Sequence, residues 1–230
     1  MTSIRHNGLD SARPPDDSAR PPRTPDDDYL DAAREAILAV GWSRTTLTDI
    51  ARRAGVSRMT LYRRWPDMQT MLADLMTREW GRVAGESVDL TGATEGRASA
   101  DDALRRITDG VVATVRGLRA NELLRRIIDV DPELLLPYLL DRRGRSQELV
   151  ATALAALIRE GQADGSIREG DPDRLARSLL LACHGFTLSA HTMVDDPATG
   201  PEHRGAPSRD ADVTEFDTEL ARLVERYLQP

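Results

Sequence analysis

Residues 42–68 constrain the fold more than any other part of the chain, because they contain two short apolar patterns with helical spacing. Gly55 separates the two patterns and can take the left-handed backbone conformation that ends a helix at little cost. Thr46, followed by Asp49, predicts a capping box for the first helix, and Ser57 is a good N-cap for the second. The stretch therefore predicts two helices joined by a tight turn, the second only about two turns long.

The second of these helices would present an open face of hydroxyls and arginines. Leu61 and Trp65, four residues apart, would form its buried stripe. Residues 44–65 contain six arginines and one acid, a local charge of +5, whereas the whole chain carries −7. A basic patch on an acidic protein is typical of a surface that contacts phosphates. The pattern predicts a helix-turn-helix that enters a DNA major groove; the alternative is the solvated surface of two amphipathic helices.

Residues on both sides of the turn also occur in a familiar order. They are Gly55-Val56-Ser57, Thr60-Leu61-Tyr62 and Trp65, preceded by the expected helix 29–40, Gly41, Thr45-Thr46 and Asp49-Ile50-Ala51. This order resembles the signature of the tetracycline-repressor (TetR) family of bacterial regulators. The resemblance is specific over residues 28–75 and extends weakly to 165–176; elsewhere only length and helical character match.

The resemblance implies which side chains would face DNA. Arg58, Met59 and Thr60 would face base edges, with Arg58 suited to a bidentate contact with guanine. The full set expected at the DNA is Thr46, Thr48, Ser57, Arg58, Met59, Thr60, Tyr62, Arg63 and Arg64. The chain departs from the family pattern at Met59 and Met68, where many relatives carry glycine and lysine.

The chain is expected to be all-α, with three parts. Residues 1–25, rich in Arg, Pro, Asp and Ser, should be a disordered arm, although Arg20 or Arg23 entering a minor groove is an alternative. Residues 26–84 should form a three-helix DNA-binding domain with a linking helix, and 85–230 a helical ligand-binding and dimerisation domain. Further helices are expected over 100–118, 121–130, 132–142, 146–163, 172–194 and 211–228, with loops over 85–98 and 195–210.

The helix from Pro172 to Val194 is apolar nearly all round, so it must pack on two sides. The resemblance implies that one side meets the same helix of a second subunit. Together with the helix from Ala211 to Leu228 it would form a four-helix homodimer interface. The alternative is an interior helix of a larger monomeric core.

The resemblance also implies a pocket for a small-molecule effector inside the second domain. Its candidate contacts are polar or aromatic residues in largely apolar helices: Asn121, Arg125, Tyr138 and His184, with His191 beside them. Each has an alternative role as a satisfied core or surface residue. Because only 4% of the residues are aromatic, an aliphatic or mixed pocket is expected.

Several classes of protein lack support in the sequence. We find no catalytic motif, no metal-ligand cluster and no sign of a cofactor, and one cysteine permits no internal disulfide. No apolar run could span a membrane, so a cytoplasmic protein is expected. The sequence therefore predicts a homodimeric transcriptional regulator that binds a palindromic double-stranded DNA operator and is released by a small molecule. It favours a repressor over an activator; a helical adaptor without ligand response is a further alternative.

Overall fold

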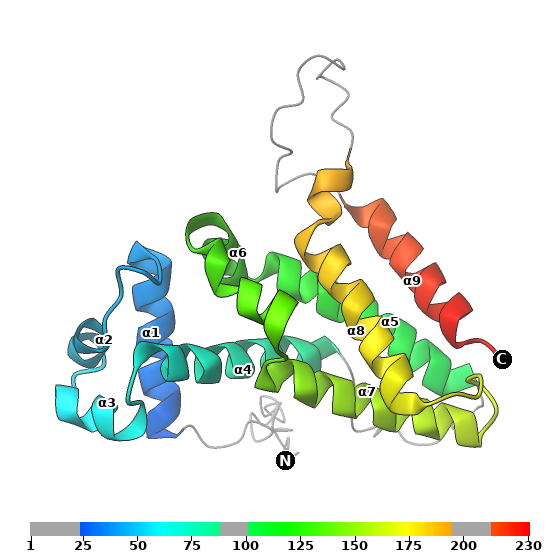
Figure 1. Cartoon of the computed structure of the whole chain (residues 1–230), viewed down its shortest axis with the longest axis horizontal. Coiled ribbons are helices and arrows are strands. Elements are labelled where there is room, and N and C mark those ends of the chain that lie inside the picture. The colour runs from blue at the N-terminus through cyan, green and yellow to red at the C-terminus, as the bar shows by residue number, and fades with distance from the viewer. Residues whose placement is uncertain (1–23, 88–100, 195–212) are drawn as a thin grey trace, which may run out of the picture.

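The computed structural model describes residues 24–87, 101–194 and 213–230, and every regular element within these ranges is helical. The all-α prediction is confirmed. Figure 1 shows α1, α2 and α3 gathered at one end of the molecule, with the long helix α4 running from them toward the other helices. The α-helices are α1 (Pro25–Val40), α2 (Leu47–Arg53), α3 (Arg58–Arg64), α4 (Met68–Ser87), α5 (Asp101–Ala120), α6 (Glu122–Val130), α7 (Arg145–Ala163), α8 (Pro172–Leu188) and α9 (Thr214–Leu228).

Helix α1 begins at Pro25, four residues before the predicted start at residue 29. Thr24 is its N-cap: the Thr24 hydroxyl accepts the Asp27 N–H at 3.3 Å, and the Asp27 carboxylate accepts the Thr24 N–H at 2.8 Å. Pro25 suits the first helical position because the amide it lacks has no partner there. Thr24 and Pro25, which were predicted to end the arm over 1–25, thus begin α1 instead, and residues 1–23 lie outside the described residues.

We call α1, α2 and α3 together the head. The first hydrophobic core lies between these three helices and their neighbours α4 and α6. Ile37, Ile50 and Leu61, one from each helix, are fully buried in it. The head does not close this core alone: α4 contributes Met71, Leu72 and Leu75, and α6 contributes Leu123 and Ile127. A second core lies among α5, α7, α8 and α9, which we call the bundle; its buried side chains include Ile107, Val115, Ile158, Leu179, Leu220 and Leu228.

An ion-pair cluster closes the bundle on one side. Asp217 on α9 is buried and accepts the Arg116 Nε–H at 2.6 Å and a hydrogen bond from the Arg119 guanidinium. Both arginines belong to α5, so the cluster fixes α9 along α5. The buried carboxylate is satisfied because it has two charged donors.

Two predicted helices are interrupted. Residues 132–142 form a 3-10 turn (Pro132–Leu134) and a π-helical turn (Pro137–Asp141), because Pro137 has no N–H to donate to the carbonyl of residue 133. The predicted helix 172–194 ends at Leu188, and a 3-10 turn follows over Ala190–Met193. The predicted loop over 85–98 does not begin at Gly85, because α4 continues to Ser87. The remainder of that loop, the predicted loop over 195–210 and residues 211–212 lie outside the described residues.

Candidate nucleic-acid interface and bundle cavity

The caps of α2 and α3 form as predicted, with one difference. The Thr46 hydroxyl accepts the Asp49 N–H at 3.2 Å, and the Ser57 hydroxyl accepts the Thr60 N–H at 3.1 Å. The Asp49 carboxylate, however, accepts from the Thr46 hydroxyl at 2.6 Å, so only half of the predicted capping box forms. That hydroxyl lowers the pKa of Asp49 below its ordinary value. Gly55, at φ +67°, makes the turn between the helices.

The structure brings the predicted DNA-facing residues to one end of the molecule, opposite α9 (Figure 1). Met59 at the start of α3 is 64% exposed, an unusual exposure for a large apolar side chain. Tyr62 and Thr60 are half-buried. The exposed members of the set are Thr46, Thr48, Ser57, Arg58, Met59, Arg63 and Arg64.

Two of the exposed arginines are held by neighbours. The Arg58 guanidinium lies 4.8 Å from the centre of the Tyr62 ring and donates to the Tyr62 hydroxyl at 3.2 Å. The Arg64 Nε–H donates to the Asp26 carboxylate of α1 at 2.7 Å. Arg63 makes no ion pair with any residue that the structure describes. Neighbouring side chains therefore position Arg58 and Arg64 of α3.

A buried carboxylate ties the turn after α1 to the end of α6. Asp131 is 2% exposed and accepts the Trp42 N–H at 2.8 Å, the Ser43 N–H at 3.1 Å and the Ser43 hydroxyl. Burial alone would raise the pKa of Asp131, but these hydrogen bonds outweigh it and lower the pKa below its ordinary value. Gly41, at φ +87°, allows the close approach, since a Cβ there would lie 3.0 Å from the Val130 Cγ1 atom.

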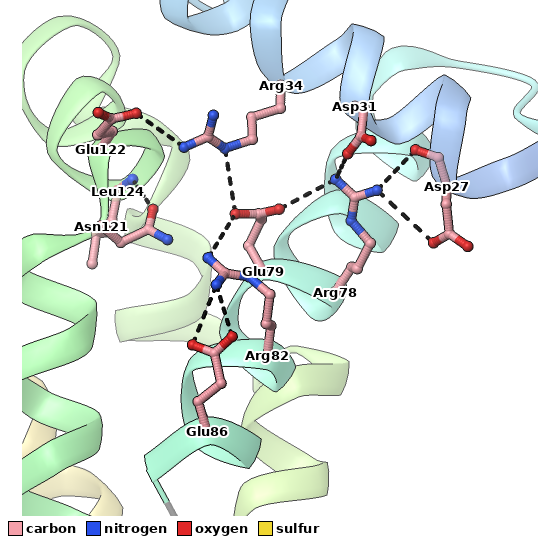
Figure 2. Close-up of polar contacts among 10 residues, drawn as sticks. All are labelled: Asp27, Asp31, Arg34, Arg78, Glu79, Arg82, Glu86, Asn121, Glu122 and Leu124. Carbon is pink, nitrogen blue, oxygen red and sulfur yellow. Dashed lines mark hydrogen bonds and ion pairs between the residues drawn. The ribbon is translucent and has the colours of Figure 1, made fainter. Parts of the chain in front are cut away.

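A second polar link joins α1, α4 and α6 (Figure 2). Glu79 on α4 is 4% exposed and lies 3.5 Å from the Arg34 Nε of α1 and 3.2 Å from a guanidinium nitrogen of Arg78. Arg34 also pairs with Glu122 of α6 at 3.1 Å. Sequence reasoning missed both Asp131 and Glu79, because the contacts of Asp131 with residues 42 and 43 and of Glu79 with Arg34 join segments far apart along the chain.

The head and the bundle are joined by α4, whose other side lines a cavity of about 360 Å³ between α4, α5, α7 and α8. This volume lies in the range of ordinary small-molecule sites. Among the residues predicted for ligand contact, Tyr138 and His184 line the cavity. Arg125 and His191 line a smaller cavity of about 90 Å³ instead.

Asn121 lies in neither cavity, contrary to the expectation of a ligand contact. It is the N-cap of α6, and its Oδ1 accepts the Leu124 N–H at 3.0 Å (Figure 2). A helix start that is buried needs such an acceptor, because its first amides have no partner within the helix. The apolar residues near Asn121, which suggested a ligand pocket, instead form the buried surroundings of this helix cap.

Comparison with known proteins identifies the family. The model of the tetR family of bacterial regulatory proteins matches residues 30–75. An uncharacterized HTH-type transcriptional regulator of Mycobacterium tuberculosis is 37% identical over 161 residues, which cover 70% of this chain and 79% of that protein. The chain belongs to the TetR family. It is a transcriptional regulator, and members of the TetR family bind DNA and small molecules and act as dimers.

Solved structures of other regulators share the fold over most of the chain. The fatty acid degradation regulator FadR of Bacillus halodurans has a TM-score of 0.58 and 17% identity, covering 89% of this chain and 96% of its own. The repressor AlkX of a Dietzia strain has a TM-score of 0.56 and 18% identity, with coverage of 88% and 96%. Among the helices that the structure describes, none is long and apolar enough to cross a membrane.

Proposed function

We propose that this chain is a homodimeric repressor that binds a palindromic operator through α2 and α3 and leaves it when a small molecule fills the bundle cavity. The observation that carries the proposal is the double role of α4. This helix contributes Met71, Leu72 and Leu75 to the core that also holds the buried side chains of α2 and α3. Met76, the next residue, belongs to that core and also lines the cavity, and Trp80, about one turn further on, packs against the core and lines the cavity too. A ligand that displaces α4 therefore moves part of the core on which α2 and α3 rest.

The decisive experiment measures binding of the purified full chain to fluorescent fragments of its own upstream region. A repressor that neutralises phosphates with arginines should lose affinity steeply as salt rises, since bound counterions are released on binding. A helical adaptor that uses the head for protein contacts should show no such dependence. If no upstream fragment is bound even at low salt, and no site is selected from a random DNA pool, the proposal fails.

Arg64 is expected to raise the affinity for DNA without contributing to sequence specificity. In the Arg64→Ala variant, affinity for all DNA sequences should fall by a similar factor, and the slope of log affinity against log salt should shrink by about one per head. The measurement is fluorescence anisotropy over a salt series on specific and scrambled fragments. Arg105→Ala removes an arginine of α5 whose side chain is 81% exposed, against 56% for Arg64, and should leave both quantities unchanged.

We place the dimer interface on α8 and α9. Leu181 on α8 is 71% exposed and Leu223 on α9 is 54% exposed, and both helices pack on the bundle through their opposite faces. Small exposed residues follow Leu181 along α8 and at its C-cap: Ala182, Gly185 and Ser189. Such side chains let two helices approach closely while the leucines are buried.

Replacing Leu181 by glutamate should give monomers. A buried carboxylate at a two-fold interface has no counter-charge and would face its own copy across the axis. Light scattering coupled to size exclusion should report the mass of one chain, and operator affinity should fall at least about a hundredfold because one half-site is lost. The control, Leu140→Glu, places the same charge at another exposed leucine, on the π-helical turn, and should leave the dimer intact.

A further inference from the structure

His184 on α8 faces the bundle cavity in one defined protonation state. The Gln147 Oε1 accepts the Gly144 N–H at 2.6 Å, which leaves the Gln147 amide nitrogen 3.0 Å from the His184 Nε2. An amide nitrogen can only donate, so the His184 Nε2 accepts and the neutral ring carries its proton on Nδ1. Burial acts in the same direction by lowering the pKa of His184.

Two hydrogen-bonding groups on this wall are left without partners. The His184 Nδ1–H has none among the residues that the structure describes. Thr187, three residues further along α8, lines the same cavity, and its Oγ1 is buried without a hydrogen bond. Residues three apart share a helix face, so the two groups lie next to each other. Buried polar groups such as the Thr187 hydroxyl are rarely left unsatisfied, and the His184 Nδ1–H on the same cavity wall is a second donor, so the two together indicate a ligand atom that accepts from both.

The rest of the wall is uncharged. Among the lining residues that the structure describes, only Arg145 has a permanent charge, and it is already paired with Asp74 of α4. Burial raises the pKa of the Cys183 thiol to about 12, so it stays protonated. The other lining residues are mainly aliphatic, with glycines, hydroxyl residues and the rings of Trp80 and Tyr138. A carboxylate bound here would lose its hydration, and no described residue of the wall offers a free cation in its place.

We propose that the cavity takes an uncharged molecule with an aliphatic body and a carbonyl oxygen that accepts from the His184 Nδ1–H and the Thr187 hydroxyl. This ligand class rests on the proposed function, in which the cavity holds the effector. Esters, ketones and lactones fit the description. Free fatty acids, which are ionised at neutral pH, do not.

The test uses the full-length protein and three matched probe series: methyl esters from hexanoate to tetradecanoate, the corresponding free acids and the corresponding alkanes. Calorimetry and thermal unfolding at pH 7.5 should show the best ester binding at least about tenfold more tightly than its acid, because only the acid brings a charge into the cavity. Equal or tighter binding of the acid overturns the proposal. So does a failure of every ester to bind.

Two variants separate the hydrogen bonds from the shape of the cavity. His184→Phe and Thr187→Val should each weaken ester binding by about two- to twelvefold and leave alkane binding within about twofold. If His184→Phe does not fold, Thr187→Val carries the same comparison. An unchanged ratio of ester to alkane affinity in the folded variants shows that these groups do not hold the ligand.

Operator release is measured in parallel, so that the two proposals fail separately. Esters that bind with the predicted ratios but do not release DNA support the ligand class and count against ligand-released repression. Release of DNA by a charged molecule that competes with the esters supports the regulator and overturns the ligand class.

Discussion

The Arg58→Ala variant should lose roughly thirtyfold to twenty-five-thousandfold in affinity for its operator. A bidentate contact between arginine and guanine contributes about 1–3 kcal/mol of discrimination, and a dimer makes the contact twice. In the structure Arg58 is exposed at the first position of α3 and is already aligned along Tyr62, 3.2 Å from its hydroxyl. Little side-chain entropy therefore remains to be lost on binding. Anisotropy titrations on the operator and on fragments with each base pair replaced give the affinities.

The pattern of loss is as informative as its size. With Arg58→Ala, affinity should become indifferent to one base pair in each half-site, while the preference at the others stays. Tyr62→Phe removes the hydroxyl that holds Arg58 but keeps the ring, and should cost less than about tenfold. A uniform loss across all fragments for Arg58→Ala would show that this arginine contacts phosphate and that base reading lies elsewhere.

The Asp131→Ala variant should lower the free energy of unfolding by about 2–4 kcal/mol, because two backbone amides and one hydroxyl lose a charged acceptor in a buried place. Chemical denaturation at one fixed dimer concentration gives the value. Glu133→Ala removes the same charge from the exposed 3-10 turn two residues later and should stay within about 0.5 kcal/mol of the unchanged protein. An equal loss of unfolding free energy in both variants would mean that the change in net charge, and not the loss of the Asp131 hydrogen bonds, causes the destabilisation.

The same carboxylate gives this stability a defined pH dependence. The pKa of Asp131 is lower in the folded than in the unfolded chain, where an ordinary value of about 3.9 applies. Its contribution is therefore fully present above that value and is lost as the pH falls through the lower folded-state pKa. The difference in stability between the unchanged protein and Asp131→Ala should be constant above about pH 5 and narrow in more acidic solution. A difference that instead narrowed toward alkaline pH would contradict the assignment.

Local patterns predicted the reading helices well. A helix cap, a glycine turn and a buried stripe each depend on residues within about four positions of one another. Ser57 is therefore the N-cap of α3, Gly55 makes the turn and Leu61 is buried, as the sequence predicted. The contacts that hold the head in place could not be predicted this way. Asp131 and its partner Ser43 are 88 residues apart, and Arg64 and Asp26 are 38 apart. No periodic pattern relates such pairs, and only the packing of α6 and α1 brings them together.

The ligand residues show a different limit. Polar residues in apolar helices were proposed as candidate ligand contacts, but residue type alone does not distinguish a helix cap from a cavity wall. Asn121 satisfies a helix start, whereas His184 lies on the cavity wall with one ring nitrogen unpaired. Thr187 gave no signal in the sequence, because threonine in a helix usually bonds to the preceding turn.

The participation of α6 in the head core also bears on how such regulators can be recombined. Leu123 and Ile127 are fully buried against the head, although they follow the described part of α4 by more than thirty residues. A chimera that transplanted residues 24–87 onto the sensor of another regulator would leave an apolar surface without its cover. New specificities are therefore better obtained by exchanging individual side chains on α3 than by grafting the whole DNA-reading unit, and the two halves of this protein should have been inherited together.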